Sequence, residues 1–171
     1  MNCLCVPSLR AFGYAIGLHQ VGPVGKHMAR VTAHFHGTPK EKAYRELIDM
    51  YAQRLKKSGV RIEYHSNKLS SREYLARLKL LKGAVIYLDE GGTLNDSIEF
   101  SKSVGQWNVD VHDTHLAVGP AEGWPKDADI EPSSKLSLSP LTFPHELAST
   151  MLVEQLYRAT EILKGSGYHK A

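Results

Sequence analysis

Residues Leu136–Pro144 read L-S-L-S-P-L-T-F-P, and an amphipathic helix pattern follows over Leu147–Lys164. The chain closes on Gly165–Ala171, which reads G-S-G-Y-H-K-A. A short alternating strand, a turn rich in Ser, Thr and Pro, a long helix and a polar aromatic tail are an unusual close for an α/β domain. Residues past a last helix are normally dispensable. Because Tyr, His and Lys side chains can handle protons and contact phosphates, we interpret this tail as a candidate active-site wall.

Length and cysteine content bound the class of protein. At 171 residues the chain is long enough for one domain with a single sizeable core. No apolar run approaches the roughly 20 residues that span a bilayer, so we expect no membrane partner. Both cysteines, Cys3 and Cys5, lie near the N-terminus, so the body has no disulfide framework and a reducing compartment fits. A lone C-x-C pair is weak evidence for a metal, and we expect no metal site.

Residues 1–28 do not read as part of the fold, and we assign residues 29–171 to one domain. The segment has no acidic residue, little periodicity, and scattered Gly and Pro. One explanation is a start codon assigned too far upstream, because Met28 directly precedes a sensible first strand. The other is an organellar presequence, a class that is acid-poor and basic. We therefore expect a cytoplasmic protein, or an organellar one if residues 1–28 are a presequence.

The formal net charge of +3 hides a strong asymmetry. Residues 40–82 carry 12 Lys/Arg and 5 Asp/Glu, whereas residues 83–171 carry 6 Lys/Arg and 13 Asp/Glu. A basic segment of this kind predicts one face that attracts a polyanion, since phosphate contacts are made locally. The alternative is that residues 40–82 form two solvated helices whose lysines only keep the protein soluble.

Hydrophobic periodicity predicts alternating strands and helices. Val31–His36 alternates apolar and polar residues, as a half-buried strand does. Ala84–Leu88 is continuously apolar, which is typical of a strand buried on both faces of a parallel sheet. The repeated order predicts an open, mostly parallel α/β sheet. The expected strands are Val31–His36, Val60–His65, Ala84–Leu88, His115–Val118 and Leu136–Ser139.

Capping residues place helices between these strands. Thr38 and Pro39 predict the start of the first helix, which ends at Ser58-Gly59. Ser70, with Glu73 three positions later, predicts a capping box at the start of a basic helix. The other expected helices are one capped by Thr93 or Asn95 and ending near Val104, a short one ending near Glu131, and the last at Leu147–Lys164.

Three predicted loops follow strands of this sheet: Leu88–Gly92, Gly119–Gly123 and Ser139–Pro144. Ligands of open parallel sheets bind at the carboxyl ends of the strands. The first two loops are glycine-rich, which lets backbone approach a ligand, but neither matches a dinucleotide or Walker pattern. The third has hydroxyl and carbonyl groups in apolar surroundings, which suit a flat heterocycle such as adenine. Each loop alone could be a tight turn; three at one edge predict a ligand site.

Other polar residues give weaker indications. His34 and His36 form an H-x-H pattern, but we place both on the outer face of a strand, as surface residues. No nucleophile–base–acid triad is evident from the spacing. The remaining candidates are His112 and His115 around an irregular stretch, His145 near the start of the last helix, and Glu122, either a general base or a helix-capping acid.

Several motifs together resemble the ribosomal RNA large subunit methyltransferase H family. They are L-S-L-S-P-L-T-F-P-H from Leu136, E-Q-L-Y-R-A-T-E-I-L-K-G from Glu154, and Y-H-K from Tyr168. V-G-P-A-E-G from Val118 and Y-L-D-E-G-G from Tyr87 are similar to two further loops of that family. The resemblance implies a SPOUT-class enzyme that uses S-adenosylmethionine to methylate N3 of a pseudouridine in 23S ribosomal RNA.

The resemblance also implies an architecture and a set of site residues. The C-terminal segment would form a trefoil knot, and the protein would be a homodimer with its last helix at the interface. The partner would be large-subunit ribosomal RNA or the assembled ribosome. The implied cofactor contacts are Leu88, Gly119, Pro120, Leu138, Ser139, Pro140, Leu141, Thr142 and Phe143; the implied catalytic residues are Arg158, Tyr168 and His169, with Lys170 binding substrate.

Pseudouridine N3 is a weak acid that must lose its proton for methyl transfer. We hypothesise that His169, or Tyr168 through a water, removes this proton, and that Arg158 orients a phosphate or a base carbonyl. The family has a second glycine where this chain has Pro120, which has no N–H to offer a cofactor. The alternative function is therefore a non-catalytic knotted protein that binds RNA or the ribosome.

Overall fold

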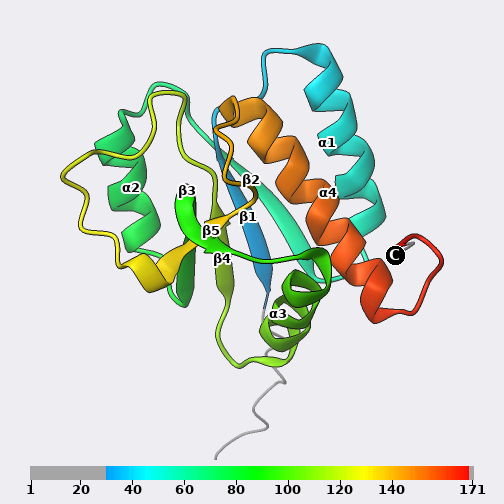
Figure 1. Ribbon diagram of the computed structural model, residues 1–171. Coiled ribbons are helices and arrows are strands. Elements are labelled where there is room, and N and C mark those ends of the chain that lie inside the picture. Colours follow the sequence, from blue (N-terminus) through cyan, green and yellow to red (C-terminus); the bar gives the residue numbers. More distant parts are fainter. Residues whose placement is uncertain (1–29, 170–171) are drawn as a thin grey trace, which may run out of the picture.

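A computed structural model describes residues 30–169 of the chain (Figure 1). The predicted extension at residues 1–28, both cysteines and Lys170 lie outside the described residues. Within the described part, no helix is long and apolar enough to cross a membrane.

The core of the fold is a sheet of five parallel strands in the order β2-β1-β4-β3-β5. This arrangement confirms the predicted mostly parallel α/β sheet. The strands are β1 Val31–His36, β2 Val60–His65, β3 Ala84–Leu94, β4 Thr114–Ala117 and β5 Lys135–Ser137. The helices are α1 Lys42–Leu55, α2 Ser71–Lys79, α3 Ser97–Val109 and α4 His145–Leu163, with a 3₁₀ turn, η1, at Pro132–Ser134.

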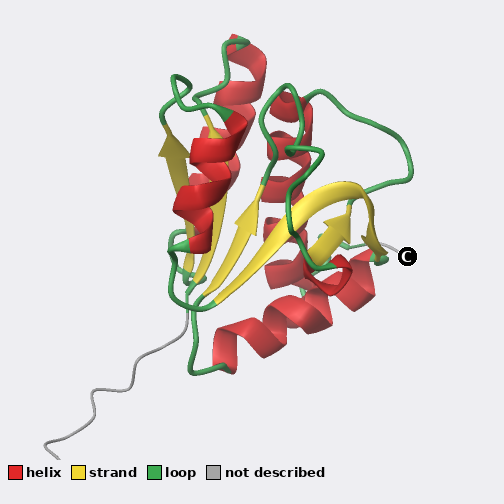
Figure 2. Cartoon of the chain, turned by 90° about the vertical axis from the view of Figure 1, so that its left-hand side faces the viewer, coloured by secondary structure: helices red, strands yellow, loops and turns green. Residues whose placement is uncertain are grey.

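Helices cover both faces of the sheet (Figures 1 and 2). On one face, α1, α3 and α4 bury an apolar core against inward residues of β1 and β4 such as Phe35 and Leu116. On the other face, α2 packs Tyr74 and Leu78 against Tyr87 in a smaller cluster. Burial of apolar surface on both sides explains why Ala84–Leu88 of β3 is continuously apolar.

Strand β3 is longer than predicted, because residues 89–92 continue it and are not a loop. The strand pairs with β5 on both sides of a register shift between Leu88 and Thr93. A Cβ atom on Gly92 would lie 2.6 Å from the backbone N and C of Leu136, so only glycine lets the two strands approach this closely. Glycines that resemble a loop therefore serve strand pairing here.

Helix starts follow capping chemistry, but not always at the predicted residue. Ser70 and Glu73 form the predicted capping box of α2. The N-cap of α1 is Glu41, not Thr38. Asp96 forms a second capping box with Glu99 in place of a cap at Thr93 or Asn95, and α3 continues to Val109 instead of ending near Val104.

The predicted short helix ending near Glu131 is absent, so β4 and β5 are joined without an α-helix in this part of the chain. Instead, Gly123 closes a turn with a positive φ of 80° and donates its N–H to the Pro120 carbonyl. Trp124 and Ile130 then pack against the α2 cluster. Tertiary packing of these apolar residues replaces the local hydrogen bonds of a helix.

The basic segment surrounds the edge of the sheet formed by β2. All 12 Lys/Arg side chains of residues 40–82 are exposed. They lie on α1, β2, α2 and the adjoining loops, and β2 is an edge strand of the sheet. We call this surface the basic edge. Its exposure is what a phosphate-binding surface requires.

Candidate functional site

A cavity of about 750 Å³ opens at the carboxyl end of β4, beside residues 88–90 in the middle of β3 and the start of α4. Its walls come from residues 88–90, residues 118–126 and residues 138–145, together with a few neighbours. The three predicted segments therefore do meet at one cavity, although the first contributes only residues 88–90 and belongs to strand β3 rather than to a loop. In parallel sheets the carboxyl edge is the usual ligand-binding position.

Most of the residues expected to contact a cofactor line this single cavity. Pro140 is the exception: it is exposed and is not part of the wall. The eight that line it are Leu88, Gly119, Pro120, Leu138, Ser139, Leu141, Thr142 and Phe143.

The wall formed by residues 138–143 offers backbone groups to a ligand. The N–H groups of Ser139, Thr142 and Phe143 have no hydrogen-bond partner among residues 30–169. The Leu141 N–H, in contrast, donates to the Ser139 Oγ at 3.1 Å. Apolar side chains beside free backbone donors match the composition of small-molecule sites.

Trp124 is a wall residue that the sequence analysis did not propose. Its indole Nε1 donates to the Leu88 carbonyl at 2.9 Å, and its ring stacks on Tyr74 with centroids 5.7 Å apart. A Cβ atom on Gly119 would lie 3.3 Å from this indole, so the glycine leaves the ring in place. A tryptophan directly after the glycine turn was the signal available in the sequence.

Charged residues of both signs border the cavity. Lys135 Nζ lies 3.1 Å from the Asp89 carboxylate, and the Thr142 hydroxyl donates to the Glu90 carboxylate. Glu122 is exposed on the wall of the cavity. No helix begins beside it, so the interpretation of this acid as a helix cap is wrong. His145 is the first residue of α4 and also lines the cavity.

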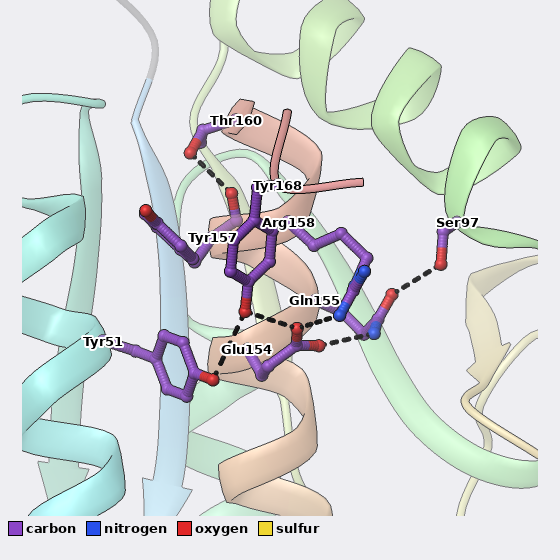
Figure 3. A network of polar contacts seen from close by, with 8 residues as sticks. All are labelled: Tyr51, Ser97, Glu154, Gln155, Tyr157, Arg158, Thr160 and Tyr168. Carbon is purple, nitrogen blue, oxygen red and sulfur yellow. Dashed lines mark hydrogen bonds and ion pairs between the residues drawn. The ribbon is translucent and has the colours of Figure 1, made fainter. Parts of the chain in front are cut away.

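The tail forms a second polar site, against the middle of α4 (Figure 3). The Tyr168 hydroxyl donates to Glu154 at 3.1 Å and lies 3.4 Å from the Tyr51 hydroxyl. Arg158 donates to the same Glu154 carboxylate at 2.6 Å, and its guanidinium sits 5.0 Å from the Tyr168 ring centre. We call Tyr51, Glu154, Arg158 and Tyr168 the tail network.

The tail network fixes the ionisation of its members. Burial raises the pKa of Tyr168, and hydrogen bonds to Tyr51 and Glu154 raise it further. The hydrogen bond to Glu154 raises the pKa of Arg158. Tyr168 is therefore a neutral hydrogen-bond donor at physiological pH and not a base, while Arg158 is a permanent cation already paired with a carboxylate.

Within one chain, the tail and the cavity are separate. The prediction that the tail forms a wall of the active site is therefore not met by a single chain. None of Arg158, Tyr168 and His169 lines the cavity. Glu154, which holds the tail, follows the cavity residue His145 by nine positions, or roughly 13 Å along a helix. His169 Nδ1 is buried with no hydrogen-bond partner among the described residues.

The histidines on β1 and β4 differ from prediction. His34 is fully buried and not on the surface, because α2 covers that face of the sheet. His36 bonds to the Leu69 carbonyl at 2.8 Å. His115 is a buried residue of β4, whereas His112 is exposed on the preceding loop beside Asp110.

Comparison with known proteins identifies the family of this chain. The family described as "Predicted SPOUT methyltransferase" matches residues 29–169. The chain belongs to this SPOUT methyltransferase family. A ribosomal RNA large subunit methyltransferase H of Gluconacetobacter diazotrophicus is 34% identical over 142 residues, covering 79% of this chain and 93% of that protein.

Two further relatives of this SPOUT family member carry the same name. The one from Koribacter versatilis is 34% identical over 138 residues, covering 78% of this chain and 92% of that protein. The one from Maridesulfovibrio salexigens is 45% identical over 96 residues, covering 56% of this chain and 61% of that protein. The resemblance to the ribosomal RNA large subunit methyltransferase H family is thereby confirmed.

Proposed function

We propose that this protein is an S-adenosylmethionine-dependent methyltransferase that acts on N3 of a pseudouridine in 23S ribosomal RNA. The name shared by its relatives supports ribosomal RNA as the substrate class. The observation that carries the proposal is the cavity itself, where eight of the nine expected cofactor contacts converge. Ligands of open parallel sheets bind beyond the carboxyl ends of the strands, and the cavity lies at that end of β4.

The cavity fits the cofactor chemically. Its volume of about 750 Å³ lies within the usual range for small-molecule sites. Leu88, Leu138 and Phe143 would hold the adenine ring between apolar groups, and the free N–H groups of the 138–143 wall would bond its polar atoms. S-adenosylmethionine, when bound, supplies an activated methyl group for in-line displacement.

The residues of the tail would prepare the acceptor. Arg158 and Tyr168 are bound to Glu154, so the unpaired His169 Nδ1 is the group left to accept the N3 proton. Tyr168, a neutral phenol whose single O–H is donated to Glu154, would position His169 beside the base. Arg158 would hold a phosphate or base carbonyl while keeping its carboxylate partner.

We propose that the site is completed in a homodimer. Because cavity and tail are separated along α4, the tail of one chain would close the cavity of its partner across an interface formed by α4. A two-fold axis would create two such composite sites. Residues 138–144 and α4 would thread the preceding loop as a trefoil knot, and the basic edge would hold ribosomal RNA of the large subunit or the assembled ribosome in the cytoplasm.

Two measurements test this function. Isothermal calorimetry should detect a micromolar S-adenosylmethionine site, and mass spectrometry of ribosomal RNA from a deletion strain should reveal one unmethylated pseudouridine. A chain without Tyr168–Ala171 should bind the cofactor normally and methylate nothing. Full methylation by this truncated chain would contradict the role of the tail.

One observation favours a second candidate, a knotted protein that binds ribosomal RNA without catalysis. Pro120 occupies a cavity position where the family has glycine, and its carbonyl is already bonded to the Gly123 N–H at 2.9 Å. Because proline has no N–H, this position offers no backbone donor to a cofactor, and its carbonyl is already occupied. Absence of calorimetric heat with S-adenosylmethionine, together with tight RNA binding, would establish this second function.

A further inference from the structure

Three histidines form a continuous hydrogen-bonded row under α2, outside the proposed methylation cavity. His34 Nδ1 lies 2.9 Å from His65 Nε2, and His34 Nε2 lies 2.9 Å from His115 Nδ1. His115 Nε2 lies 3.1 Å from the Lys82 carbonyl oxygen. The row crosses β2, β1 and β4, and none of the three rings lines the cavity.

The Lys82 carbonyl fixes the proton positions along this row. A carbonyl oxygen only accepts, so His115 carries its proton on Nε2 and accepts on Nδ1. His34 must then donate from Nε2 to His115, which leaves a lone pair on His34 Nδ1. In the hydrogen-bonded row, His65 Nε2–H donates to that lone pair. These hydrogen bonds leave His34 and His115 each with one ring proton.

A carboxylate completes the donor set at the end of the row. Glu63 places one oxygen 3.8 Å from His34 Nδ1 and the other 3.8 Å from His65 Nε2. Ligand atoms of these three residues all lie within 4.8 Å of one another. Two imidazoles and a carboxylate are common zinc ligands, and a fourth position is then left for water.

The distances are close to those of a tetrahedral site. Metal–nitrogen bonds of roughly 2.1 Å place two tetrahedral ligand nitrogens ~3.4 Å apart. The two histidine nitrogens are 2.9 Å apart and the carboxylate oxygens are 3.8 Å away, so each needs to move by about half an ångström. Glu63 supplies an approach path, because its side chain is 55% exposed while that of His34 is 1% exposed.

We propose that His34, His65 and Glu63 bind one divalent cation of the zinc type, with His115 as the residue that orients His34. The cation takes the place of the proton shared by the two rings, as His65 moves its proton from Nε2 to Nδ1. Hydrogen bonding of a metal-bound histidine to a second group is the usual support for such a ligand, and here His115 accepts that bond. This proposal reverses the expectation of no metal site.

The surroundings define what the cation would do. Tyr74 on α2 packs its ring against His65, with centroids 5.0 Å apart. Arg77, also on α2, is close enough to His65 to lower its pKa, after the larger effect of burial and against the opposing effect of Glu63. Since His34 lies on β1 and the other two ligands lie on β2, the cation would fasten the edge strand to the sheet. It would stabilise the fold without contacting the methylation cavity.

The test uses the untagged full chain with Cys3→Ser and Cys5→Ser, so that neither a histidine tag nor the two thiols binds metal. After removal of metal with a chelator, Zn²⁺ binding is measured by equilibrium dialysis, and Co²⁺ absorption reports tetrahedral geometry. We expect one Zn²⁺ per chain at micromolar or lower concentration and a higher thermal midpoint. Absence of binding at these concentrations would overturn the proposal.

Variants separate this site from other histidines. His65→Gln and Glu63→Gln each remove a proposed ligand at the accessible end of the histidine row, and each should weaken Zn²⁺ binding by at least about tenfold. His115→Leu removes the hydrogen-bond acceptor of His34 and should weaken binding to a similar extent. His115→Gln retains an acceptor for His34 and should keep the Co²⁺ spectrum, and Arg77→Gln should bind Zn²⁺ more tightly. His112→Gln, at an exposed histidine beside Asp110, is the matched control and should change nothing. Unchanged binding in folded His65→Gln and Glu63→Gln would contradict the assignment.

Discussion

The two ends of α4 are built in opposite ways. At its start, His145 borders a cavity whose walls are glycine turns, apolar side chains and free backbone N–H groups. From its middle onward, Glu154 and Arg158 hold the tail in a network where nearly every polar side chain has a partner. The first region has binding capacity, and titratable side chains such as Glu122 and His145 stand at its border. The second has the proposed acceptor-side residues and no cavity among the described residues, so it does not by itself hold both cofactor and acceptor.

This difference explains why each region tolerates different changes. The cavity depends on backbone positions, so added atoms that displace backbone should damage it most. The tail network depends on side-chain hydrogen bonds, and removal of one bond should cost about 1 kcal/mol. Substitutions at the two ends can therefore be ranked by expected effect.

The largest effect is expected from Gly92→Ala, which should disrupt the cavity at the start of α4. The added Cβ would lie 2.6 Å from Leu136 backbone atoms and would separate β3 from β5. We expect a loss of stability of ~3 kcal/mol or more and no cofactor binding, measured by denaturant unfolding and calorimetry. Gly91→Ala is the matched control, since its Cβ would meet only the flexible Asp89 side chain at 3.3 Å. Equal behaviour of the two variants would contradict the close approach of β3 and β5.

A smaller effect at the same end is expected from Trp124→Phe. This change removes the hydrogen bond to the Leu88 carbonyl and exposes part of the wall. Loss of about 1 kcal/mol predicts a cofactor dissociation constant raised about fivefold in calorimetry. Trp107→Phe on α3, which lies outside the cavity, should leave that constant unchanged.

Charge reversal on the basic edge should affect RNA binding while both ends of α4 remain intact. Lys57→Glu lies on this edge, and Lys102→Glu, at an exposed lysine of α3 outside it, is the control. If Lys57 contacts a phosphate, its reversal should weaken ribosomal RNA binding and reduce the slope of log affinity against log salt by about 1. Equal slopes for the two variants in filter-binding titrations would argue that the lysines of residues 40–82 serve solubility only.

Tyr168→Phe should cost about 1 kcal/mol at neutral pH for the lost hydrogen bond, and its pH-dependent effect, the smallest expected here, appears only in alkali. The pKa of Tyr168 is raised in the folded chain above its ordinary value of about 10. Its stabilising contribution is therefore complete below pH 10 and decreases as pH rises beyond it. Between pH 10 and 12, thermal midpoints of the wild type should fall more steeply than those of Tyr168→Phe. Tyr44→Phe, on α1 outside the tail network, should follow the wild type.

Local patterns in the sequence identified most of the fold. Val31–His36 and Val60–His65 have the predicted bounds, and the capping box at Ser70 forms as expected. Residues 89–92 were predicted as a loop because glycines usually mark turns, whereas the flanking residues Leu88 and Thr93 both pair with Leu136, more than 40 positions away in the sequence. Strand pairing over such a separation is a tertiary property that local pattern does not contain.

The candidate site was predictable to the extent that it uses loops at strand ends. The turn at residues 119–123 was recognisable from its glycines and its place after an apolar strand, and the family resemblance supplied individual contacts. The burial of His34 was missed because alternation cannot reveal that α2 covers the polar face of β1. The distance between tail and cavity was missed because contacts of Tyr168 with Tyr51 and Glu154 depend on how the chain turns after α4.

A heterodimer experiment tests most directly whether cavity and tail come from different chains. One chain lacks Tyr168–Ala171 and the other carries Gly119→Leu to fill the cavity; they are co-expressed with different tags and purified through both. Each homodimer should be inactive, and the heterodimer should have about half the wild-type methylation rate, because one composite site is intact. A control heterodimer of wild-type chain with a chain carrying both changes should be inactive. An inactive first heterodimer and a half-active control would contradict this account.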